Sequence, residues 1–333
     1  MAPKTSIQQV DEFGLINLIS RVLKSSQRNS QLVLGIGDDA AVFKTSKKMW
    51  NVATVDALVE GIHFDLRYTN FEKLGRKALS SNLSDIAAMG AVPTWALLNL
   101  TIPAKITADN ITELYRGISA VAKKYQTQVI GGNITRAKNE LVICITLLGE
   151  VEPAFILKRS SARAGDIIAV TGDLGASQAG LRVLQKRKPS SVFSYITEKH
   201  LNPEPRNEWI RRLLDKGVKI NGCIDISDGL SSDLSHVCRA SNVGAELELA
   251  HIPVHPETLR AAQMARDNVL EYVLHGGEEY ELLMTLTPRN FKKAKRILGK
   301  NITAIGRIAA SHTISGLSKN RKIKIESKGY KHF

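Results

Sequence analysis

Aspartates stand at several places in this sequence beside glycines or apolar runs. The first such segment, Gly35-Ile36-Gly37-Asp38-Asp39-Ala40-Ala41, presents two adjacent carboxylates after flexible residues. Neighbouring carboxylates repel, so their proximity costs free energy unless a cation or hydrogen-bond donors compensate. Mg²⁺ suits such a group, because this hard cation binds carboxylates together with water and substrate phosphate. Gly and Asp are also common in solvated turns, and this alternative stays open for the segment taken alone.

Two further aspartates strengthen the magnesium interpretation. Asp56 follows the apolar run 52–55, at the end of a predicted strand, where α/β folds tend to place ligand groups. Asp85 lies three positions after Asn82, and therefore on the same face of a predicted helix. These positions are far apart in sequence, so the fold has to bring their carboxylates together.

A third segment, Ile224-Asp225-Ile226-Ser227-Asp228-Gly229-Leu230, runs from a buried-strand pattern directly into Asp, Ser and Asp. Either Ser227 or Asp228 suits the N-cap of the helix predicted to begin near Leu230. Capping explains one of these polar residues but not all three, so the segment also fits a metal or phosphate site.

Paired glycines complete the set. Gly131-Gly132-Asn133 follows one predicted strand, and Gly276-Gly277-Glu278 precedes another. Such pairs let backbone N–H groups approach phosphate oxygens closely, although they also occur in plain turns. The sequence has no G-x-x-x-x-G-K-[ST] motif, so ATP binding requires a different phosphate cradle.

The elements that position these residues alternate between strand and helix, which predicts an α/β fold. A break near residues 150–163 predicts two domains, 1–153 and 154–333. Strands are predicted at 50–55, 95–102, 129–130, 141–148, 167–171, 222–226, 245–249, 280–286 and 302–308. Helices are predicted at 74–89, 111–125, 177–185, 206–216, 230–241, 256–265 and 289–300.

The net charge of +14 first suggests a polyanion partner. However, residues 289–333 hold 13 basic residues and one acidic residue, which leaves 33 basic and 31 acidic residues in the first 288. The basic segment predicts either a solvated lysine-rich face or a nucleic-acid surface, and no RNP-type aromatic motif supports the second.

The cellular setting follows from what the sequence lacks. No segment has the pattern of a membrane span or of a signal peptide. The three cysteines have no C-x-x-C spacing, which argues against a disulfide framework or a zinc site. We therefore expect a cytoplasmic protein that binds neither membrane nor nucleic acid.

Taken in order, the motifs resemble those of the thiamine-monophosphate kinases. The resemblance rests on segments 35–41, 55–64, 82–90, 130–133, 224–230 and 276–282 and on the ending Lys328-Gly329-Tyr330-Lys331-His332-Phe333. It implies a two-domain α/β fold, with an N-terminal ATP- and magnesium-binding domain that pairs in a homodimer and a C-terminal mixed-sheet domain that closes over nucleotide and substrate. The implied reaction is ATP-dependent phosphorylation of thiamine monophosphate to thiamine diphosphate, assisted by several Mg²⁺ ions.

The resemblance also implies roles for individual residues. The positions that match metal ligands are Asp39, Thr54, Val55, Asp56, Asp85, Asn133, Asp225 and Asp228. The positions that match nucleotide contacts are Gly132, Asn133, Arg159 and Ser227, of which Arg159 could also stabilise the transferring phosphoryl group. The positions that match substrate contacts are His63, Glu278 and Tyr330.

Three positions depart from the usual pattern of these kinases. Asn133 stands where Asp is usual, Val55 where Thr is common, and Glu279 where Asp is frequent. An amide oxygen carries no charge, so we expect Asn133 to hold Mg²⁺ more weakly than Asp would.

Other enzymes of the superfamily that includes the thiamine-monophosphate kinases fit this sequence less well. No cysteine precedes Cys144, which disfavours selenophosphate synthetase, and the last residue is Phe333, where the hydrogenase-maturation dehydratase has cysteine. His63 and the Gly329-Tyr330 ending disfavour aminoimidazole ribonucleotide synthetase, the nearest enzymatic alternative.

Overall fold

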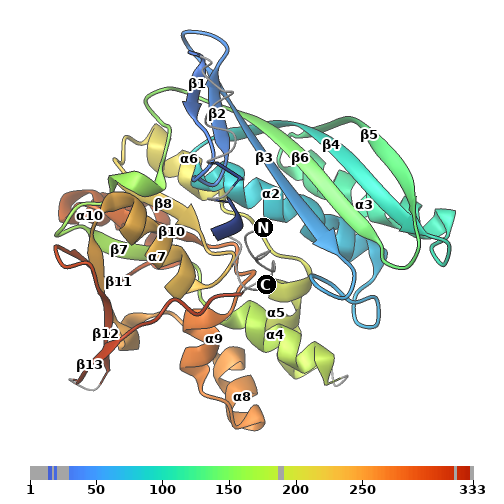
Figure 1. Ribbon diagram of the computed structural model, residues 1–333. Helices are drawn as coiled ribbons and strands as arrows, with labels where there is room; N and C mark the ends of the chain where they lie inside the picture. Colours follow the sequence, from blue (N-terminus) through green and yellow to red (C-terminus); the bar gives the residue numbers. More distant parts are fainter. Residues whose placement is uncertain (1–13, 17–18, 21–29, 187–190, 319–320, 331–333) are drawn as a thin grey trace, which may run out of the picture.

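The computed structural model describes residues 14–16, 19–20, 30–186, 191–318 and 321–330. Two β-sheets organise these residues, and helices pack against each (Figure 1). The strand orders are β1-β2-β3-β6-β4-β5 and β13-β12-β9-β11-β7-β10-β8, so neither sheet mixes strands from the two halves of the chain. The expected two-sheet α/β architecture is therefore confirmed.

The N-terminal sheet is antiparallel except where β4 runs parallel to β5. Alternate residues of β6 are buried, as expected for a sheet with helices on one face. The two helices on that face pack closely, because Gly75 and Gly117 leave no side chain between their backbones. The elements are β1 (Leu32–Leu34), β2 (Ala41–Lys44), β3 (Trp50–Val59), α2 (Phe71–Ala88), β4 (Val92–Pro103), α3 (Ala108–Lys124), β5 (Gln128–Ala137) and β6 (Val142–Val151).

The C-terminal sheet is mixed, since β12 runs parallel to β9 while its other pairs are antiparallel. Strand β7, which lies between β11 and β10, is buried along its whole length. The strands are β7 (Ile167–Thr171), β8 (Gly222–Asp225), β9 (Gly244–Glu248), β10 (Leu282–Leu286), β11 (Ile302–Ala309), β12 (Ile314–Ser318) and β13 (Arg321–Lys324). The helices are α4 (Ala176–Gln185), α5 (Ser194–Leu201), α6 (Asn207–Asp215), α7 (Leu230–Ser241), α8 (Pro256–Ala265), α9 (Val269–His275) and α10 (Pro288–Leu298).

Helix α2 joins the two halves. Its early apolar residues, such as Leu79, belong to the N-terminal core, whereas Ala87 and Ala88 pack in a cluster with Leu213 and Cys223 of the C-terminal half. The helix begins with Asn70, whose side chain accepts a hydrogen bond from the backbone of Lys73. Asp85, in the second half of α2, is thereby brought to the boundary between the two sheets.

Three boundaries differ from the sequence predictions, and each difference changes the setting of a predicted site residue. Asp56 lies inside β3, opposite Ile145 of β6, and not at a strand end. The Gly131–Asn133 segment continues β5 and does not form a turn, because glycine lets β5 approach the backbone of Leu98. The strand predicted to begin at Tyr280 begins at Leu282 instead, because Tyr280 has a φ of 52°.

The sequence patterns also missed several elements, namely β1, β2, α5, α9, β12 and β13. Most are short, so a periodic pattern has few residues in which to show itself. Within the described ranges, no helix combines the length and the apolar character needed to cross a membrane.

Candidate active site

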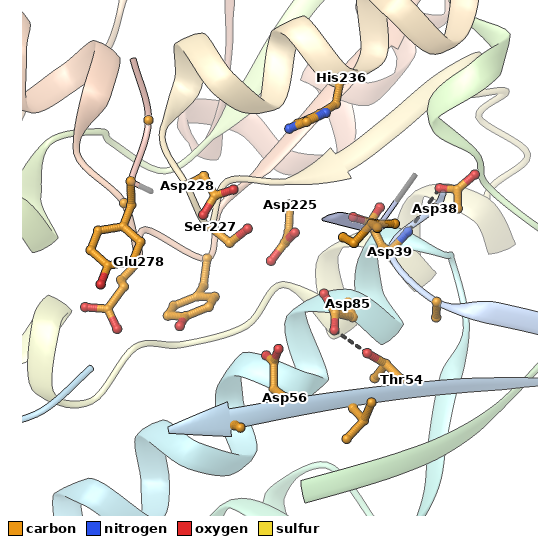
Figure 2. A pocket seen from close by; sticks show the side chains of 18 of the residues that line it. Asp38, Asp39, Thr54, Asp56, Asp85, Asp225, Ser227, Asp228, His236 and Glu278 are labelled. Atoms are coloured by element: carbon orange, nitrogen blue, oxygen red, sulfur yellow. Dashed lines mark hydrogen bonds between the residues drawn. The ribbon is translucent and has the colours of Figure 1, made fainter. Parts of the chain in front are cut away.

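Three aspartates from distant parts of the chain converge at the boundary between the sheets. Asp39 comes from the loop before β2, Asp85 from α2 and Asp225 from the end of β8, and one carboxylate oxygen of each lies within 4.8 Å of the other two (Figure 2). The side chains of Asp39 and Asp225 are 1% and 2% exposed. Buried carboxylates in such proximity are unfavourable unless positive charge or protons accompany them.

The pKa values of these aspartates are raised, because burial and mutual repulsion make their ionisation unfavourable. Burial and the neighbouring Asp39 raise the pKa of Asp225 to about 8. Burial, together with Asp56, Asp225 and Asp39, raises the pKa of Asp85 well above its ordinary value. Burial and Asp39 also raise the pKa of Asp38 to about 6, against the opposing effect of Arg159. The protein thus holds carboxylates where ionisation is unfavourable, as functional sites often do.

Hydrogen bonds fix the orientation of this cluster without neutralising it. Thr54 donates its hydroxyl to Asp85, and Ser84 donates to Asp225 Oδ2 over 2.7 Å. Asp39 Oδ2 is buried and has no hydrogen-bond partner among the described residues. An unpartnered buried oxygen beside two other carboxylates fits a bound hard cation.

Arg159 is the one cation in direct contact with the aspartate cluster among the described residues. It lies in a 3₁₀ turn, Arg159–Ser161, and donates to Asp39 Oδ1 through Nε over 3.2 Å and through Nη2. Its backbone N–H donates to Asp38 Oδ1 over 3.3 Å. Burial lowers the pKa of its guanidinium, but Asp39 and Asp38 more than offset this and raise it. Arg159 therefore remains charged beside the cluster, where it can meet a phosphate.

Strand β3 places alternate residues on its two faces. Thr54 is 8% exposed and faces α2, whereas Val55 is 61% exposed and faces outward. Asp56 again faces the cluster, which agrees with its effect on the pKa of Asp85 (Figure 2). Only the backbone of Val55 is therefore suited to contact a ligand in the site.

The loop after β8 forms the side of the site opposite β3, and backbone hydrogen bonds hold it in place. The N–H of Glu278 donates to Ser227 O over 2.7 Å, and the N–H of Tyr330 donates to Asp228 O over 3.0 Å. Neither Ser227 nor Asp228 caps α7, because the N-cap residue is Gly229, whose backbone N–H donates to Asp233 Oδ2 over 3.0 Å. The capping interpretation is therefore wrong, and both polar residues border the site (Figure 2).

These residues surround one cavity of about 1220 Å³ between the two sheets. Figure 2 shows Asp39 and Glu278 on opposite sides of Asp225. At the Glu278 end, His63 Nδ1 accepts a hydrogen bond from Val59 N over 3.0 Å, so a neutral ring carries its proton on Nε2. The predicted site residues that line the cavity are Asp39, Thr54, Val55, Asp56, His63, Asp85, Arg159, Asp225, Ser227, Asp228, Glu278 and Tyr330.

Gly132 and Asn133 lie elsewhere. Both are exposed on β5, the edge strand that β6 and β4 separate from β3, and they do not line the cavity. The last three residues of the predicted ending, Lys331 to Phe333, lie outside the described residues.

Sequence reasoning missed Lys77 and His200, which lie beside Glu278. Burial and Lys77 lower the pKa of His200 to about 3, so its ring is neutral. One signal was present for Lys77, since it occupies a position between the apolar residues Leu74 and Ala78 on a helix. Nothing in the pattern around His200 separates it from a surface histidine.

Comparison with known proteins places the chain in a class. Residues 37–151 match the family model "AIR synthase related protein, N-terminal domain", and residues 163–318 match its C-terminal counterpart. The chain is therefore an AIR synthase related protein in both of its halves. Crystal structures of the hydrogenase maturation protein HypE share this fold alone, at 15% identity and a TM-score of 0.72.

Within that class, the chain belongs to the thiamine-monophosphate kinase family. It is 36% identical to the thiamine-monophosphate kinase of Bacillus subtilis strain 168, over 97% of this chain and 100% of the relative. It is 37% identical to that of Escherichia coli K12, over 97% and 98%. The solved structure described as "AaThiL complexed with AMPPCP and TMP" matches with a TM-score of 0.87 and 32% identity, over 99% of both chains.

Proposed function

We propose that this protein transfers the γ-phosphoryl group of ATP to the phosphate of thiamine monophosphate, giving thiamine diphosphate and ADP. The observation that carries this proposal is the convergence of Asp39, Asp85 and Asp225 with Arg159 in a cavity large enough for two phosphorylated ligands. Membership of the thiamine-monophosphate kinase family supports it, as does the similarity to a structure that holds an ATP analogue and TMP.

Mg²⁺ is the cation that fits the aspartate cluster. Its holders would be Asp39, Asp85 and Asp225, with Asp56 and Asp228 beside them and with Thr54 and the backbone of Val55 on the β3 side. The buried, unpartnered Asp39 Oδ2 and the raised pKa values of the cluster support this assignment. Bound there, Mg²⁺ would neutralise the charge of the phosphates and orient them for transfer.

The residues of the chain hold the two substrates in line. An oxygen of the thiamine monophosphate phosphate bonds to Pγ of ATP while the bond from Pγ to the β,γ-bridging oxygen breaks, and the electron pair leaves with ADP. Arg159 is placed to contact the transferring group, and Ser227 to contact the nucleotide. A phosphate monoester has a second pKa of about 6, so the attacking oxygen needs no general base. Positioning is then the main catalytic effect.

The substrate end of the cavity is formed by His63, Glu278 and Tyr330. A carboxylate and an aromatic ring suit the cationic, aromatic body of thiamine monophosphate. The phosphate of the substrate would then point toward the aspartates, in the direction in which Figure 2 shows Asp228 and Asp225 following Glu278.

A homodimer would explain the position of Gly132 and Asn133. The outer face of the N-terminal sheet exposes apolar side chains that include Trp95, Leu97 and Ile134. Exposed apolar patches of this kind mark protein–protein contacts, and β5 is the last strand at one edge of the sheet. Pairing two such faces would bring Gly132 and Asn133 of the partner subunit toward the cavity. The variant Leu97→Glu should then sediment as a monomer and lose activity together with dimerisation.

We assign different roles to the two domains, each of which contains one of the two sheets. Residues 1–153 would bind ATP and Mg²⁺ and form the dimer, and residues 154–333 would close over nucleotide and substrate. The free cysteines and the phosphorylated substrates are consistent with a cytoplasmic enzyme.

Phosphorus NMR tests the proposed reaction. The purified protein is incubated with ATP, Mg²⁺ and either thiamine monophosphate or free thiamine. We expect resonances of thiamine diphosphate and ADP to grow only with the monophosphate. Formation of ADP without thiamine diphosphate would refute the proposal.

A further inference from the structure

Lys77 lies at the contact between the two halves of the molecule. It belongs to α2 and is only 2% exposed, which is rare for a lysine. Its Nζ donates to the backbone carbonyl of His63 over 3.2 Å and forms an ion pair with Glu278 Oε1 at 2.6 Å. His63 comes from the loop after β3, whereas Glu278 comes from the loop before β10. One ammonium group thus links two residues of the proposed substrate end.

The backbone at Glu278 needs such support. Its φ of 59° lies in the left-handed region, as does the φ of 52° at Tyr280. Non-glycine residues adopt this conformation at a cost, and they keep it where surrounding contacts enforce it. The N–H groups of both residues donate to the loop after β8, to Ser227 O and Ile226 O over 2.7 and 2.9 Å. These bonds fix the backbone, and the side chain still has to be oriented.

Two partners orient the carboxylate of Glu278. Lys77 contacts Oε1, and His200 Nδ1 lies 3.5 Å from Oε2 and 3.1 Å from Ser177 Oγ. Because the His200 ring is neutral, Lys77 is the charged partner of Glu278. The side chain of Glu278 is 24% exposed, so it faces both the cavity and these buried partners.

We propose that Lys77 is a positioning residue that holds His63 and Glu278 at a fixed separation and thereby sets the affinity of the cavity for thiamine monophosphate. The inference rests on the proposed function, because it assumes that this end of the cavity takes the thiamine moiety. Lys77 touches neither the aspartate cluster nor Arg159 in the structure, so its removal should affect one substrate and spare the other.

Steady-state kinetics with each substrate varied in turn test this role. In Lys77→Met, we expect KM for thiamine monophosphate to rise at least about tenfold, as for loss of a hydrogen bond to a charged group, while KM for ATP stays within about twofold. Lys77→Arg keeps the charge but changes its geometry, and should give an intermediate KM. The matched control is Lys73→Met, one turn earlier on α2, which removes an ion pair to Glu198 of α5 that is also formed between the halves. This control should leave both KM values unchanged.

A double-mutant cycle with Glu278→Gln covers the case in which Lys77→Met folds poorly. If Lys77 acts through Glu278, Lys77→Arg should raise KM for thiamine monophosphate less in the Glu278→Gln protein than in the wild type. Equal rises in both backgrounds, or equal rises in the KM values of both substrates, would overturn the positioning role and leave Lys77 a structural residue. A wild-type protein that makes no thiamine diphosphate would instead refute the proposed function, and this inference with it.

Discussion

Asp225, the last residue of β8, and Glu281, which directly precedes β10, are both buried carboxylates, yet their surroundings shift their pKa values in opposite directions. Asp225 lies opposite Leu282 in the pairing of β8 with β10, one residue from Glu281. Burial and Asp39 raise the pKa of Asp225 to about 8. Burial also acts to raise the pKa of Glu281, but Lys199 and Arg206 hold it at about 2.

The contacts explain the contrast. Glu281 is fully buried and accepts from Lys199 Nζ, Arg206 Nε and Thr171 Oγ1, each over 2.6 Å. Its charge is therefore satisfied by the protein itself. The aspartate cluster has Arg159 as its adjacent protein cation, and Asp39 Oδ2 lacks a hydrogen-bond partner among the described residues. The protein itself neutralises the charge of Glu281, whereas the aspartate cluster requires a bound cation to neutralise its charge.

The largest difference between the aspartate cluster and Glu281 should appear in the effect of their substitution on kcat. Replacing Asp225 by Asn removes a charged metal ligand, and we expect kcat to fall by about 100- to 1000-fold. The metal-free variant should at the same time melt at a higher temperature than the wild type, because one source of repulsion is gone. Product assays and calorimetry in EDTA measure the two effects. A variant that loses both activity and metal-free stability would show that Asp225 is only structural.

Glu281→Gln should have the opposite pattern. It removes the buried carboxylate that pairs with both Lys199 and Arg206, so the free energy of unfolding should fall by about 3–5 kcal/mol. The Mg²⁺ concentration for half-maximal activity should remain that of the wild type, measured at a temperature where the variant is folded. A large change in the Mg²⁺ requirement would mean that the two carboxylate groups are not separate.

The pH dependence of stability should differ in sign. Asp225 has a raised pKa in the folded state, so the stability it contributes in metal-free protein is present below about pH 4 and is lost as the pH rises toward 8. Glu281 has a lowered pKa, so its contribution is present above about pH 4.5 and is lost as the pH falls toward 2. Denaturant unfolding in EDTA, compared with Asp225→Asn, isolates the first effect. A constant difference between wild type and variant from pH 4 to 8 would disprove it.

The smallest expected effect concerns Asn133. In the proposed homodimer, Asn133 of one subunit lies near the cavity of the other. Asn133→Asp would add a charged ligand there, so the Mg²⁺ concentration for half-maximal activity should fall several-fold. Asn99→Asp is the control, because Asn99 lies opposite Asn133 in the pairing of β4 with β5 and adds the same charge beside it. An unchanged requirement in Asn133→Asp, or an equal fall in both variants, would remove the special role of this position.

The sequence identified the aspartates but not the way the fold presents them. Asp39 and Asp225 stood out because they stand beside glycines or a buried-strand pattern, and Asp85 because it shares a predicted helix face with Asn82. Sequence patterns ended the strand before Asp56, since a charged residue breaks an apolar run, although β3 continues to Val59 because it pairs with β6. Local composition does not register such long-range pairing.

Other features of the site depend on contacts that no local pattern encodes. Gly131 and Gly132 lie inside a strand because the backbone of Leu98 comes so close that no side chain fits at Gly132. Lys77 is buried because a carboxylate from the other half of the chain meets it. Glu278 and Tyr280 adopt positive φ values through bonds to the loop after β8. In each case, the partner is distant in sequence.

Equilibrium dialysis with Mn²⁺ and AMPPCP tests most directly whether the aspartate cluster holds divalent cations together with the nucleotide. Asp225→Asn is compared with Glu279→Gln, which alters another buried carboxyl group whose pKa is raised to about 8. We predict that Asp225→Asn binds less Mn²⁺ per chain than the wild type, while Glu279→Gln binds as much. If Asp225→Asn binds as much Mn²⁺ as the wild type, the aspartate cluster does not hold the cation.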